Sequence, residues 1–429
     1  MKILIKRVCG NLNRKATLRI LKVFLKGLCY ATLLVGILFT VVLLIPIRNG
    51  LFISISYFIT QITGFLMFLY LLTTILLLKL SIRKRTRNWN RIAISTIGLS
   101  LTIINALPLI ITPITIQTAE QEFNTAYGID WRGQIPPDVE SHFLISQFSL
   151  SSYFLGFPHR DCKIETDILY YDADGIQLYF DVYYPRDSNR ALPGNNSIII
   201  KIHGGSWQFG DKTLGNVLVL NKYLAAQGYV VFDIQYGLYD AGGSSFIPTP
   251  DYVKGNFTLH DMVTQIGNFT KQLESTFAGQ YHGNLDSVFI MGGSAGGQLT
   301  GVIGLGYNDP YFAGNFSTAL SIKGIVPIYP PDFAPSFLLP GEPSLSFEKF
   351  TPSNLVDSSD PPAIIFQGLR DDLVPLSSPL AIKNALVSNG VSCMLLTFPS
   401  AAHASDLIVG NSYSQVWVYY LERFLYLQQ

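Results

Sequence analysis

Charged residues are scarce in this sequence. They make up 14% of its 429 residues, whereas an ordinary soluble domain has about 25%. The shortage is greatest in three apolar stretches that contain no Asp, Glu, Lys or Arg, at residues 28–47, 51–78 and 92–116. A helix needs about 20 apolar residues to cross a bilayer, and buried helices of soluble proteins are usually shorter and carry a polar face. The sequence therefore predicts three transmembrane helices.

Acidic residues are absent from the chain before Glu120, whereas basic residues are clustered there. Residues 1–27 carry eight Lys or Arg and residues 79–91 carry six, but the short turn at 48–50 carries only one. Positively charged loops stay on the cytoplasmic side. We therefore expect a cytoplasmic N-terminus, and everything after about residue 117 on the extracytoplasmic or lumenal side. A cleaved signal peptide is the competing interpretation of the first stretch, but its basic region is long and no small-residue cleavage pattern follows.

Several signals of other protein classes are also missing. The net charge of +1 gives no indication of a nucleic-acid partner. No His, Cys and carboxylate residues occur together at the spacing of metal ligands, so neither a metal nor an organic cofactor is expected. Of four cysteines, Cys162 and Cys393 fall on the expected outer side, where a disulfide is permitted. The sequence leaves open whether they pair.

These patterns divide the chain into four parts. We expect a basic cytoplasmic N-terminus at 1–27, a three-helix transmembrane region at 28–116, a juxtamembrane connector at 117–163 and a globular domain at 164–429. The connector shows no clear period and contains many aromatic residues, and we expect it to pack over the active site of the domain. Within that domain, the proline-rich and apolar stretch 330–361 is a candidate lid.

From residue 164 onward, short β-branched runs alternate with amphipathic segments. This alternation is typical of βαβ units and a mostly parallel sheet. A hairpin is expected around the turn at 172–175, because Asp and Gly favour tight turns. Further strands are expected at 197–205, 229–236, 287–293, 322–330, 362–368 and 391–398, with helices at 218–228 and 261–277, from 295 onward, and at 412–427.

A serine surrounded by glycines follows one of these expected strands, in the segment VFIMGGSAGGQL at 288–299. A flexible glycine loop is one interpretation of this G-x-S-x-G pattern. The other is a nucleophile elbow, in which the backbone turns so sharply at Ser294 that side chains at Gly292 and Gly296 would collide. The expected strand before Ser294 and the expected helix after it favour the elbow.

A serine hydroxyl becomes a nucleophile when a histidine accepts its proton and an acid orients that histidine. Where a nucleophile elbow is present, the acid and the histidine follow the serine in the chain, and His403 is the only histidine after Ser294. The acid is expected after the penultimate strand, where GLRDDLVP offers Asp371 and Asp372. The G-x-x-D-x-x-V-P spacing favours Asp371, with Asp372 as a solvated neighbour. The alternative is a surface turn that both acids decorate.

Negative charge on a reacting carbonyl oxygen needs preorganised N–H donors. The segment HGGSW at 203–207 directly follows an expected strand, and its glycines let backbone N–H groups approach that oxygen. We assign Gly204, Gly205 and the N–H of Ala295 to this oxyanion hole. Each such donor contributes about 3 kcal/mol to stabilising the transition state.

Two other side chains of the HGGSW segment support the motif. His203 is expected to pin the loop rather than to take part in the chemistry. Trp207 is either a core residue or a wall of the acyl pocket, and the sequence does not separate these two roles.

In order and on matching elements, HGGSW, GGSAGG, GLRDDLVP and His403 resemble the α/β-hydrolase superfamily. The branch they resemble contains esterases related to hormone-sensitive lipase, feruloyl-esterase-like proteins, kynurenine formamidases and prenylcysteine methylesterases. The resemblance covers residues 164–429 and implies a mostly parallel eight-stranded sheet flanked by helices. Gln298 stands where many relatives have histidine, and Ser206 where lipase-like relatives have a third glycine, so no particular substrate is carried over.

Together these features predict a membrane-anchored serine hydrolase that cleaves carboxylic esters through an acyl-enzyme. Ser294 attacks the ester carbonyl, His403 transfers the proton and Asp371 orients His403. The apolar stretch 330–361 and the nearby bilayer favour an ester with an apolar acyl or alkyl part. Two alternatives stay open, namely an amidase or formamidase that uses the same triad and a catalytically silent binding module. The oligomeric state cannot be predicted from the sequence.

Overall fold

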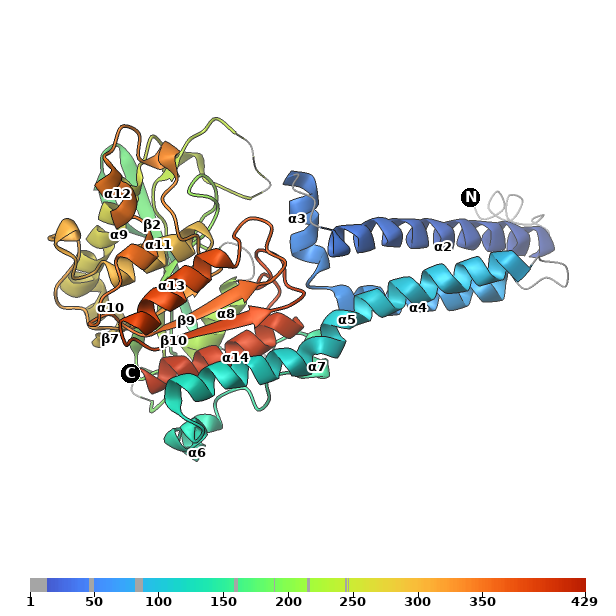
Figure 1. The fold of residues 1–429 in the computed structure, drawn as a ribbon, viewed down its shortest axis with the longest axis horizontal. Helices are drawn as coiled ribbons and strands as arrows, with labels where there is room; N and C mark the ends of the chain where they lie inside the picture. The colour runs from blue at the N-terminus through green and yellow to red at the C-terminus, as the bar shows by residue number, and fades with distance from the viewer. Residues whose placement is uncertain are drawn as a thin grey trace, which may run out of the picture. The chain divides into compact units, whose positions relative to one another are not determined.

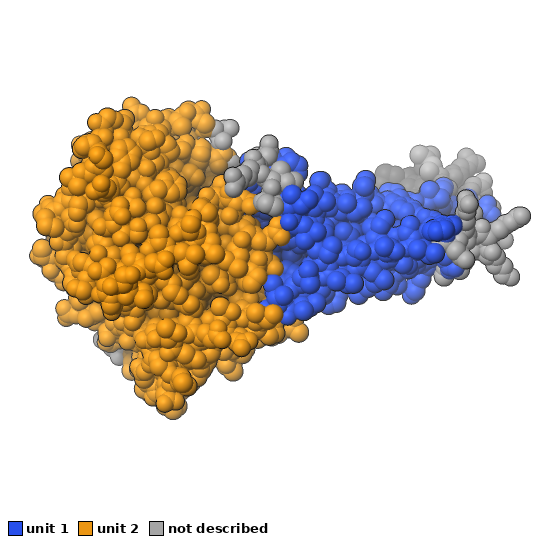
Figure 2. All heavy atoms as spheres, in the orientation of Figure 1, with its two compact units in different colours: residues 1–111 blue, residues 112–429 orange. Residues whose placement is uncertain are grey.

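The computed structural model describes residues 14–45, 50–81, 88–157, 161–188, 190–213, 217–243, 245 and 247–429. It divides into two compact units, residues 1–111 and 112–429 (Figure 2). The helix α5 (Asn88–Tyr127) contributes residues to both units. The boundary expected between residues 116 and 117 therefore falls inside one continuous helix.

The first unit consists of apolar helices. α2 (Arg14–Leu44), α4 (Thr63–Leu80) and α5 are long and apolar enough to cross a membrane (Figure 1). Packing between them is close, because a β-carbon on Gly98 of α5 would lie 1.9 Å from the Thr74 hydroxyl oxygen of α4. The three apolar stretches predicted from the sequence are thus present as long helices.

The second stretch is not the single helix that was expected over 51–78. α3 (Gly50–Ile59) ends before Thr60, and α4 begins only at Thr63. The Thr60 hydroxyl donates a hydrogen bond to the Ser56 carbonyl at 2.9 Å. The next two N–H groups, of Gln61 and Ile62, bond to carbonyls three residues back rather than four. The α-helical ladder is interrupted there, so the prediction of one uninterrupted helix over 51–78 is wrong.

Two helices extend beyond the predicted spans. α2 begins at Arg14 rather than at Leu28, and α5 ends at Tyr127 rather than at Ile116. The added segments contain Lys, Arg, Glu and Gln, which all favour helix. A count of apolar residues does not register these helix formers, because it responds only to hydrophobicity.

Eight strands form one sheet in the second unit, in the order β1-β2-β4-β3-β7-β8-β9-β10. β2 pairs antiparallel with β1 and β4, and the other neighbours pair in parallel. The prediction of a mostly parallel eight-stranded sheet is confirmed. The strands are β1 (Lys163–Ala173), β2 (Ile176–Tyr184), β3 (Ser197–Ile202), β4 (Val230–Ile234), β7 (Asn284–Gly293), β8 (Ile322–Ile328), β9 (Ala363–Gly368) and β10 (Cys393–Phe398).

Helices cover both faces of this sheet. α9 (Leu259–Gln272), α11 (Ala295–Leu305) and α13 (Ser377–Ser388) share one apolar cluster with Ile198 of β3. Successive strand residues point to opposite faces, and the neighbouring Ile199 belongs to a second cluster. That cluster contains the end of α5, α8 (Val217–Ala226) and α14 (Ser412–Leu427).

Shorter elements lie in the connections between these helices and strands. They are η1 (Trp131–Gln134), α6 (Pro137–Glu140), α7 (Leu150–Leu155), β5 (Leu238–Tyr239), η2 (Asp251–Val253), β6 (Lys254–Gly255), the π-helical turn η3 (Leu273–Phe277), α10 (Ala278–Tyr281), η4 (Pro310–Phe312), η5 (Ser336–Leu338), α12 (Ser344–Lys349) and η6 (Pro352–Asn354). β5 and β6 pair with each other outside the main sheet.

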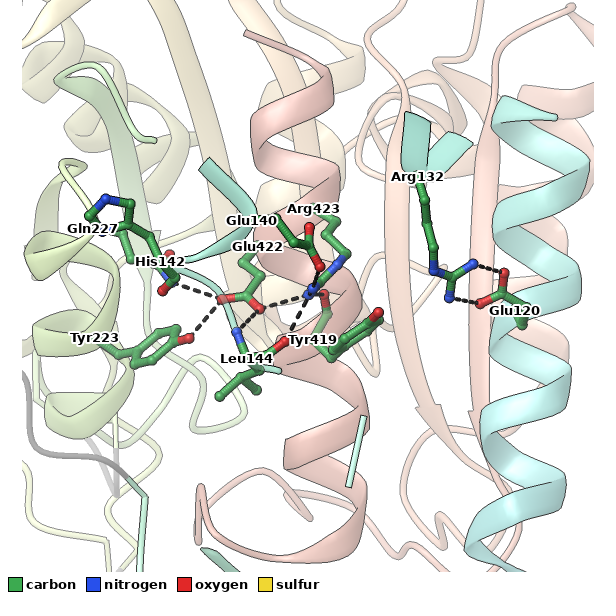
Figure 3. Close-up of polar contacts among 10 residues, drawn as sticks. All are labelled: Glu120, Arg132, Glu140, His142, Leu144, Tyr223, Gln227, Tyr419, Glu422 and Arg423. Atoms are coloured by element: carbon green, nitrogen blue, oxygen red, sulfur yellow. Dashed lines mark hydrogen bonds and ion pairs between the residues drawn. The ribbon is translucent and has the colours of Figure 1, made fainter. Parts of the chain in front are cut away.

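A buried ion pair binds the connector to α14 (Figure 3). The side chains of Glu422 and Arg423 are fully buried, and their charged groups lie 2.8 Å apart. Arg423 also pairs with Glu140 of α6, and the Glu422 carboxylate accepts hydrogen bonds from the Leu144 N–H at 2.7 Å and the Tyr223 hydroxyl at 2.7 Å. The connector, for which the sequence shows no clear period, therefore has regular structure and packs on α14.

Candidate active site

Ser294 occupies a sharp turn between β7 and α11. Its backbone dihedrals are φ 56° and ψ −122°, a region that side-chain-bearing residues rarely adopt. A β-carbon on Gly292 would lie 2.3 Å from the Gly296 carbonyl oxygen, and one on Gly296 would lie 2.2 Å from the Ile202 carbonyl oxygen. The turn therefore requires glycine at both positions, and the side chain of Ser294 projects from it only half-buried.

Three side chains form a hydrogen-bonded chain at this turn. His403 Nε2 lies 2.9 Å from Ser294 Oγ, and His403 Nδ1 lies 2.7 Å from Asp371 Oδ2. The second oxygen of Asp371 accepts hydrogen bonds from the N–H groups of Leu373 at 2.9 Å and Val374 at 2.8 Å. The structure thus brings together the serine, histidine and acid that the sequence order predicts, and it puts Asp371 against the imidazole.

The elements that carry these residues explain why they meet. Ser294, Asp371 and His403 follow β7, β9 and β10 respectively, and these strands run in the same direction in one sheet. Loops after parallel strands gather at the carboxyl edge of the sheet, where α/β folds hold their sites.

The proposed oxyanion loop lies directly beside the serine turn. A β-carbon on Gly204 would be 2.6 Å from the Gly293 carbonyl oxygen and 3.2 Å from Ser294 Cβ. Gly205 has φ +120°, a conformation that favours glycine. Ala295 is the first residue of α11, where helical N–H groups lack a partner within the helix. Of the three positions assigned to the oxyanion hole, Gly204 and Ala295 therefore lie directly beside Ser294, and Gly205 follows Gly204 in the chain.

His203 fixes the conformation of this loop through a ring contact and two hydrogen bonds. Its ring stacks on Tyr236 with 4.4 Å between ring centroids, and its Nδ1–H donates to the Gly204 carbonyl at 2.7 Å. The Tyr236 hydroxyl donates to the His203 carbonyl at 2.9 Å. Burial lowers the pKa of His203 to about 4, so the imidazole is neutral near pH 7. These contacts agree with a loop-pinning role.

Trp207 is buried at the end of the same loop. Its indole N–H donates to the Gln298 side-chain oxygen at 3.2 Å, and the Gln298 amide donates to the Phe350 carbonyl at 2.7 Å. The indole ring also packs edge-on against Phe333, with 6.3 Å between centroids. Trp207 belongs to the core cluster on its face of the sheet, and Gln298 connects it to the segment that was a candidate lid.

The candidate lid at 330–361 is bonded to the rest of the unit at several points. The Gln298 amide of α11 donates to the Phe350 carbonyl at 2.7 Å, and the Tyr311 hydroxyl lies 3.1 Å from the Ser346 hydroxyl. Lys349 of α12 pairs with Asp309 at 2.6 Å. These contacts hold the segment against the body of the unit in the described conformation.

Sequence reasoning did not identify Tyr329 and Asp406, which lie beside the candidate triad. The Tyr329 ring packs on the His403 ring with 4.4 Å between centroids, and the Tyr329 hydroxyl donates to Asp406 at 2.8 Å. Neither residue belongs to a sequence motif. Only its position in the chain could have pointed to Tyr329, which directly follows β8 at the same edge of the sheet.

Among the residues that the structure describes, no three His, Cys, Asp or Glu residues are grouped closely enough to hold a metal ion.

A family model described as the prolyl oligopeptidase family matches residues 219–427, just under half of the chain. The matched range contains Ser294, Asp371 and His403, whereas the loop at 203–207 lies before it.

Three curated relatives come from Mycobacterium tuberculosis. The esterase LipQ is 23% identical over 66% of this chain and 68% of its own length. The probable carboxylic ester hydrolase LipM is 24% identical over 58% of both chains, and the esterase LipC is 26% identical over 59% of this chain and 62% of its own. The chain thus spans less than two thirds of LipM and LipC.

Solved structures of esterases are also similar to this chain. Esterase B from Lactobacillus rhamnosis is 21% identical, with a TM-score of 0.49 over 63% of this chain and 87% of that one. Esterase 2 from Thermogutta terrifontis is 20% identical, with a TM-score of 0.44 over 58% of this chain and 84% of that one. The family match, the relatives named as esterases and the strand order together support a carboxylesterase-like hydrolase with the α/β-hydrolase fold.

Proposed function

We propose that this protein is a membrane-anchored serine carboxylesterase. The observation that carries the proposal is the hydrogen-bonded chain from Asp371 through His403 to Ser294. A nucleophilic serine requires carboxylate, imidazole and hydroxyl in this order. The similarity to proteins named esterase supports a carboxylic ester as the substrate.

In the proposed reaction, Ser294 Oγ attacks the ester carbonyl while His403 Nε2 takes the serine proton. Asp371 accepts the Nδ1–H bond of His403 and stabilises the imidazolium that forms. The backbone N–H groups assigned to Gly204, Gly205 and Ala295 stabilise the oxyanion. The alcohol leaves with the proton from His403, and the acyl group stays on Ser294. Water then attacks the acyl-enzyme with His403 as base, which releases the acid and restores the serine.

Exposed apolar side chains near the site support an ester with an apolar acyl or alkyl part. Phe333 and Phe337 of the candidate lid are 46% and 40% exposed. Leu369 and Leu373, on either side of Asp371 in the chain, are each 45% exposed. Burying such side chains against a substrate contributes about 25 cal/mol per Å² of apolar area, so an apolar group on the ester strengthens binding.

The first unit supports anchoring in a membrane. It supplies three helices of sufficient length and hydropathy, and the basic residues at 1–27 and 79–91 favour a cytoplasmic N-terminus. Three crossings then put the second unit on the extracytoplasmic or lumenal side. An impermeant maleimide tests this topology in a Cys162→Ser background, because Asp251→Cys provides a fully exposed thiol. Labelling of intact cells is expected at position 251 and not in a matched Lys6→Cys variant, and the reverse result would contradict the orientation.

Hydrolysis by the full chain in detergent tests the activity. The parent and Ser294→Ala are compared on a short-chain aryl ester and on the anilide of the same acid, together with covalent labelling by a fluorophosphonate. Ester turnover and labelling in the parent, both lost in Ser294→Ala, are expected. Preference for the anilide would instead favour an amidase, an alternative with which the family description agrees. If a folded parent shows neither turnover nor labelling, the remaining interpretation is a catalytically silent binding module.

A further inference from the structure

Tyr329 contacts both the serine turn and the histidine loop. Its backbone N–H donates to the Phe366 carbonyl of β9 at 2.7 Å. A β-carbon on Gly293 would lie 2.9 Å from its hydroxyl oxygen, and its ring packs on the imidazole of His403. Tyr329 also adopts φ 39°, a conformation that is rare for a bulky residue. A strained, buried aromatic residue between two members of the triad points to a function at that position.

The hydroxyl of Tyr329 is bonded to the loop that carries His403. It donates to the Asp406 carboxylate at 2.8 Å, and Asp406 lies three residues after His403. Ala404, between them, has φ 55°, so the chain turns back on itself immediately after the histidine. Tyr329 therefore contacts this turn at two residues, through its ring at His403 and through its hydroxyl at Asp406.

Buried charges lie behind the turn. Lys201 of β3 donates to the Asn221 side chain at 3.1 Å, and Asn221 donates to Asp233 of β4 at 3.0 Å. Burial lowers the pKa of Lys201 to about 8, although the carboxylates of Asp233 and Asp406 oppose this shift. Burial raises the pKa of Asp406, and the Tyr329 hydrogen bond and the charges of Lys201 and His403 oppose that rise. The charges of Lys201 and Asp406 therefore act on each other.

Resting on the proposed function, we propose that Tyr329 and Asp406 act as a positioning pair for His403. The ring of Tyr329 fixes the plane of the imidazole, and the Tyr329–Asp406 bond fixes the loop, so that Nε2 faces Ser294 Oγ. The Asp406 carboxylate also favours the imidazolium that forms when the serine proton is transferred. The pair is a second support for the histidine, in addition to the direct Asp371 bond.

Two conservative variants of the full chain test the pair. Tyr329→Phe keeps the ring and removes the hydroxyl, and Asp406→Asn keeps the shape and removes the charge. Each is expected to lower kcat about 10- to 100-fold with little change in KM, since small misplacement of a catalytic group has effects of this size. The double variant is expected to be no slower than the slower single variant.

Tyr223→Phe is the matched control, because the buried Tyr223 hydroxyl also donates to a carboxylate, that of Glu422, at 2.7 Å. It is expected to keep the parent's kcat. If Tyr329→Phe behaves like Tyr223→Phe, or if the two pair variants have additive effects on kcat, the positioning role is overturned. Fluorophosphonate labelling separates this failure from failure of the triad itself. A parent that is not labelled at Ser294 overturns the catalytic assignment and the pair with it.

Discussion

Glu122 of α5 and Lys383 of α13 form an ion pair at 2.6 Å, and the same carboxylate accepts a hydrogen bond from the Leu395 N–H at 3.0 Å. Leu395 belongs to β10, the last strand of the sheet. The outer side of such a strand presents N–H groups that no further strand can bond. Glu122 therefore covers an edge of the sheet that would otherwise be open.

We expect Glu122→Ala to lower the free energy of unfolding of the second unit by about 1–3 kcal/mol, because it leaves a partly buried N–H without its acceptor. Lys383→Ala is the matched control, since it removes the ion pair and leaves the Leu395 bond in place. Denaturant unfolding of the full chain in detergent measures both. Equal losses in the two variants would contradict the edge-covering explanation.

Breaking the buried ion pair of Glu422 and Arg423 should lower the free energy of unfolding more than breaking the partly exposed pair of Glu122 and Lys383. Arg423→Met is expected to destabilise the second unit by about 3–5 kcal/mol, because it leaves the buried Glu422 carboxylate without its cation. Adding Glu422→Gln removes that uncompensated charge and is expected to restore part of the loss. Thermal unfolding of the single and double variants measures the difference. A double variant less stable than Arg423→Met would show that the charge itself is not the cause.

Asp371→Asn should separate the orientation of the His403 imidazole from the binding of the substrate. The amide keeps the shape of the side chain but no longer accepts a bond from the His403 Nδ1–H in the required tautomer. We expect kcat for the aryl ester to fall by up to about 10⁴-fold, the size of the effect known for serine triads, with KM little changed. Asp372→Asn is the matched control and should stay close to the parent. Loss of activity in Asp372→Asn alone would reassign the acid.

His203 should make stability depend on pH. Its pKa is about 4 in the folded chain because of burial, and about 6.5 when unfolded. Between these values only the unfolded chain binds the proton. The contribution of neutral His203 to the free energy of unfolding is therefore complete above about pH 6.5. It is lost as pH falls toward 4, at up to about 1.4 kcal/mol per pH unit. We expect His203→Gln to flatten the change of unfolding temperature with pH in this window.

The exposed His282 provides the control for that measurement. His282→Asn keeps a residue that tolerates the left-handed backbone found there (φ 58°), and it should leave the pH slope unchanged. Identical slopes for the parent and His203→Gln would show that His203 does not resist protonation in the fold.

Local chemistry explains which predictions from the sequence succeeded. The Asp-Gly turn was predictable because Asp174 and Gly175 both adopt positive φ, at 55° and 74°, as a two-residue hairpin requires. The meeting of His403 with Ser294 was predictable because one histidine follows the serine in the chain and parallel strands bring their loops to one edge. Both conclusions need only neighbouring residues and chain order.

Features that depend on tertiary contact were not predictable. The connector is ordered by buried partners on α14, such as Arg423, that are distant in sequence. Tyr329 and Asp406 belong to no motif, and only the fold brings them together. The sequence also left open a bridge between Cys162 and Cys393. Cys162 directly precedes β1 and Cys393 is the first residue of β10, at opposite edges of an eight-stranded sheet. Strands spaced about 4.8 Å apart separate them far beyond bonding distance.

The glycines around Ser294 restrict how this enzyme can be altered. Gly204, Gly292 and Gly296 each face a backbone oxygen within 2.6 Å of where a β-carbon would stand, so any other residue displaces main chain rather than a side chain. If Ser294 is the nucleophile, as proposed, mutant libraries that randomise these positions are expected to return mostly inactive clones. Changes in substrate range, in the laboratory or during divergence, must therefore come from exposed positions around the site, such as Phe333 and Leu373, where side chains can vary without moving the serine.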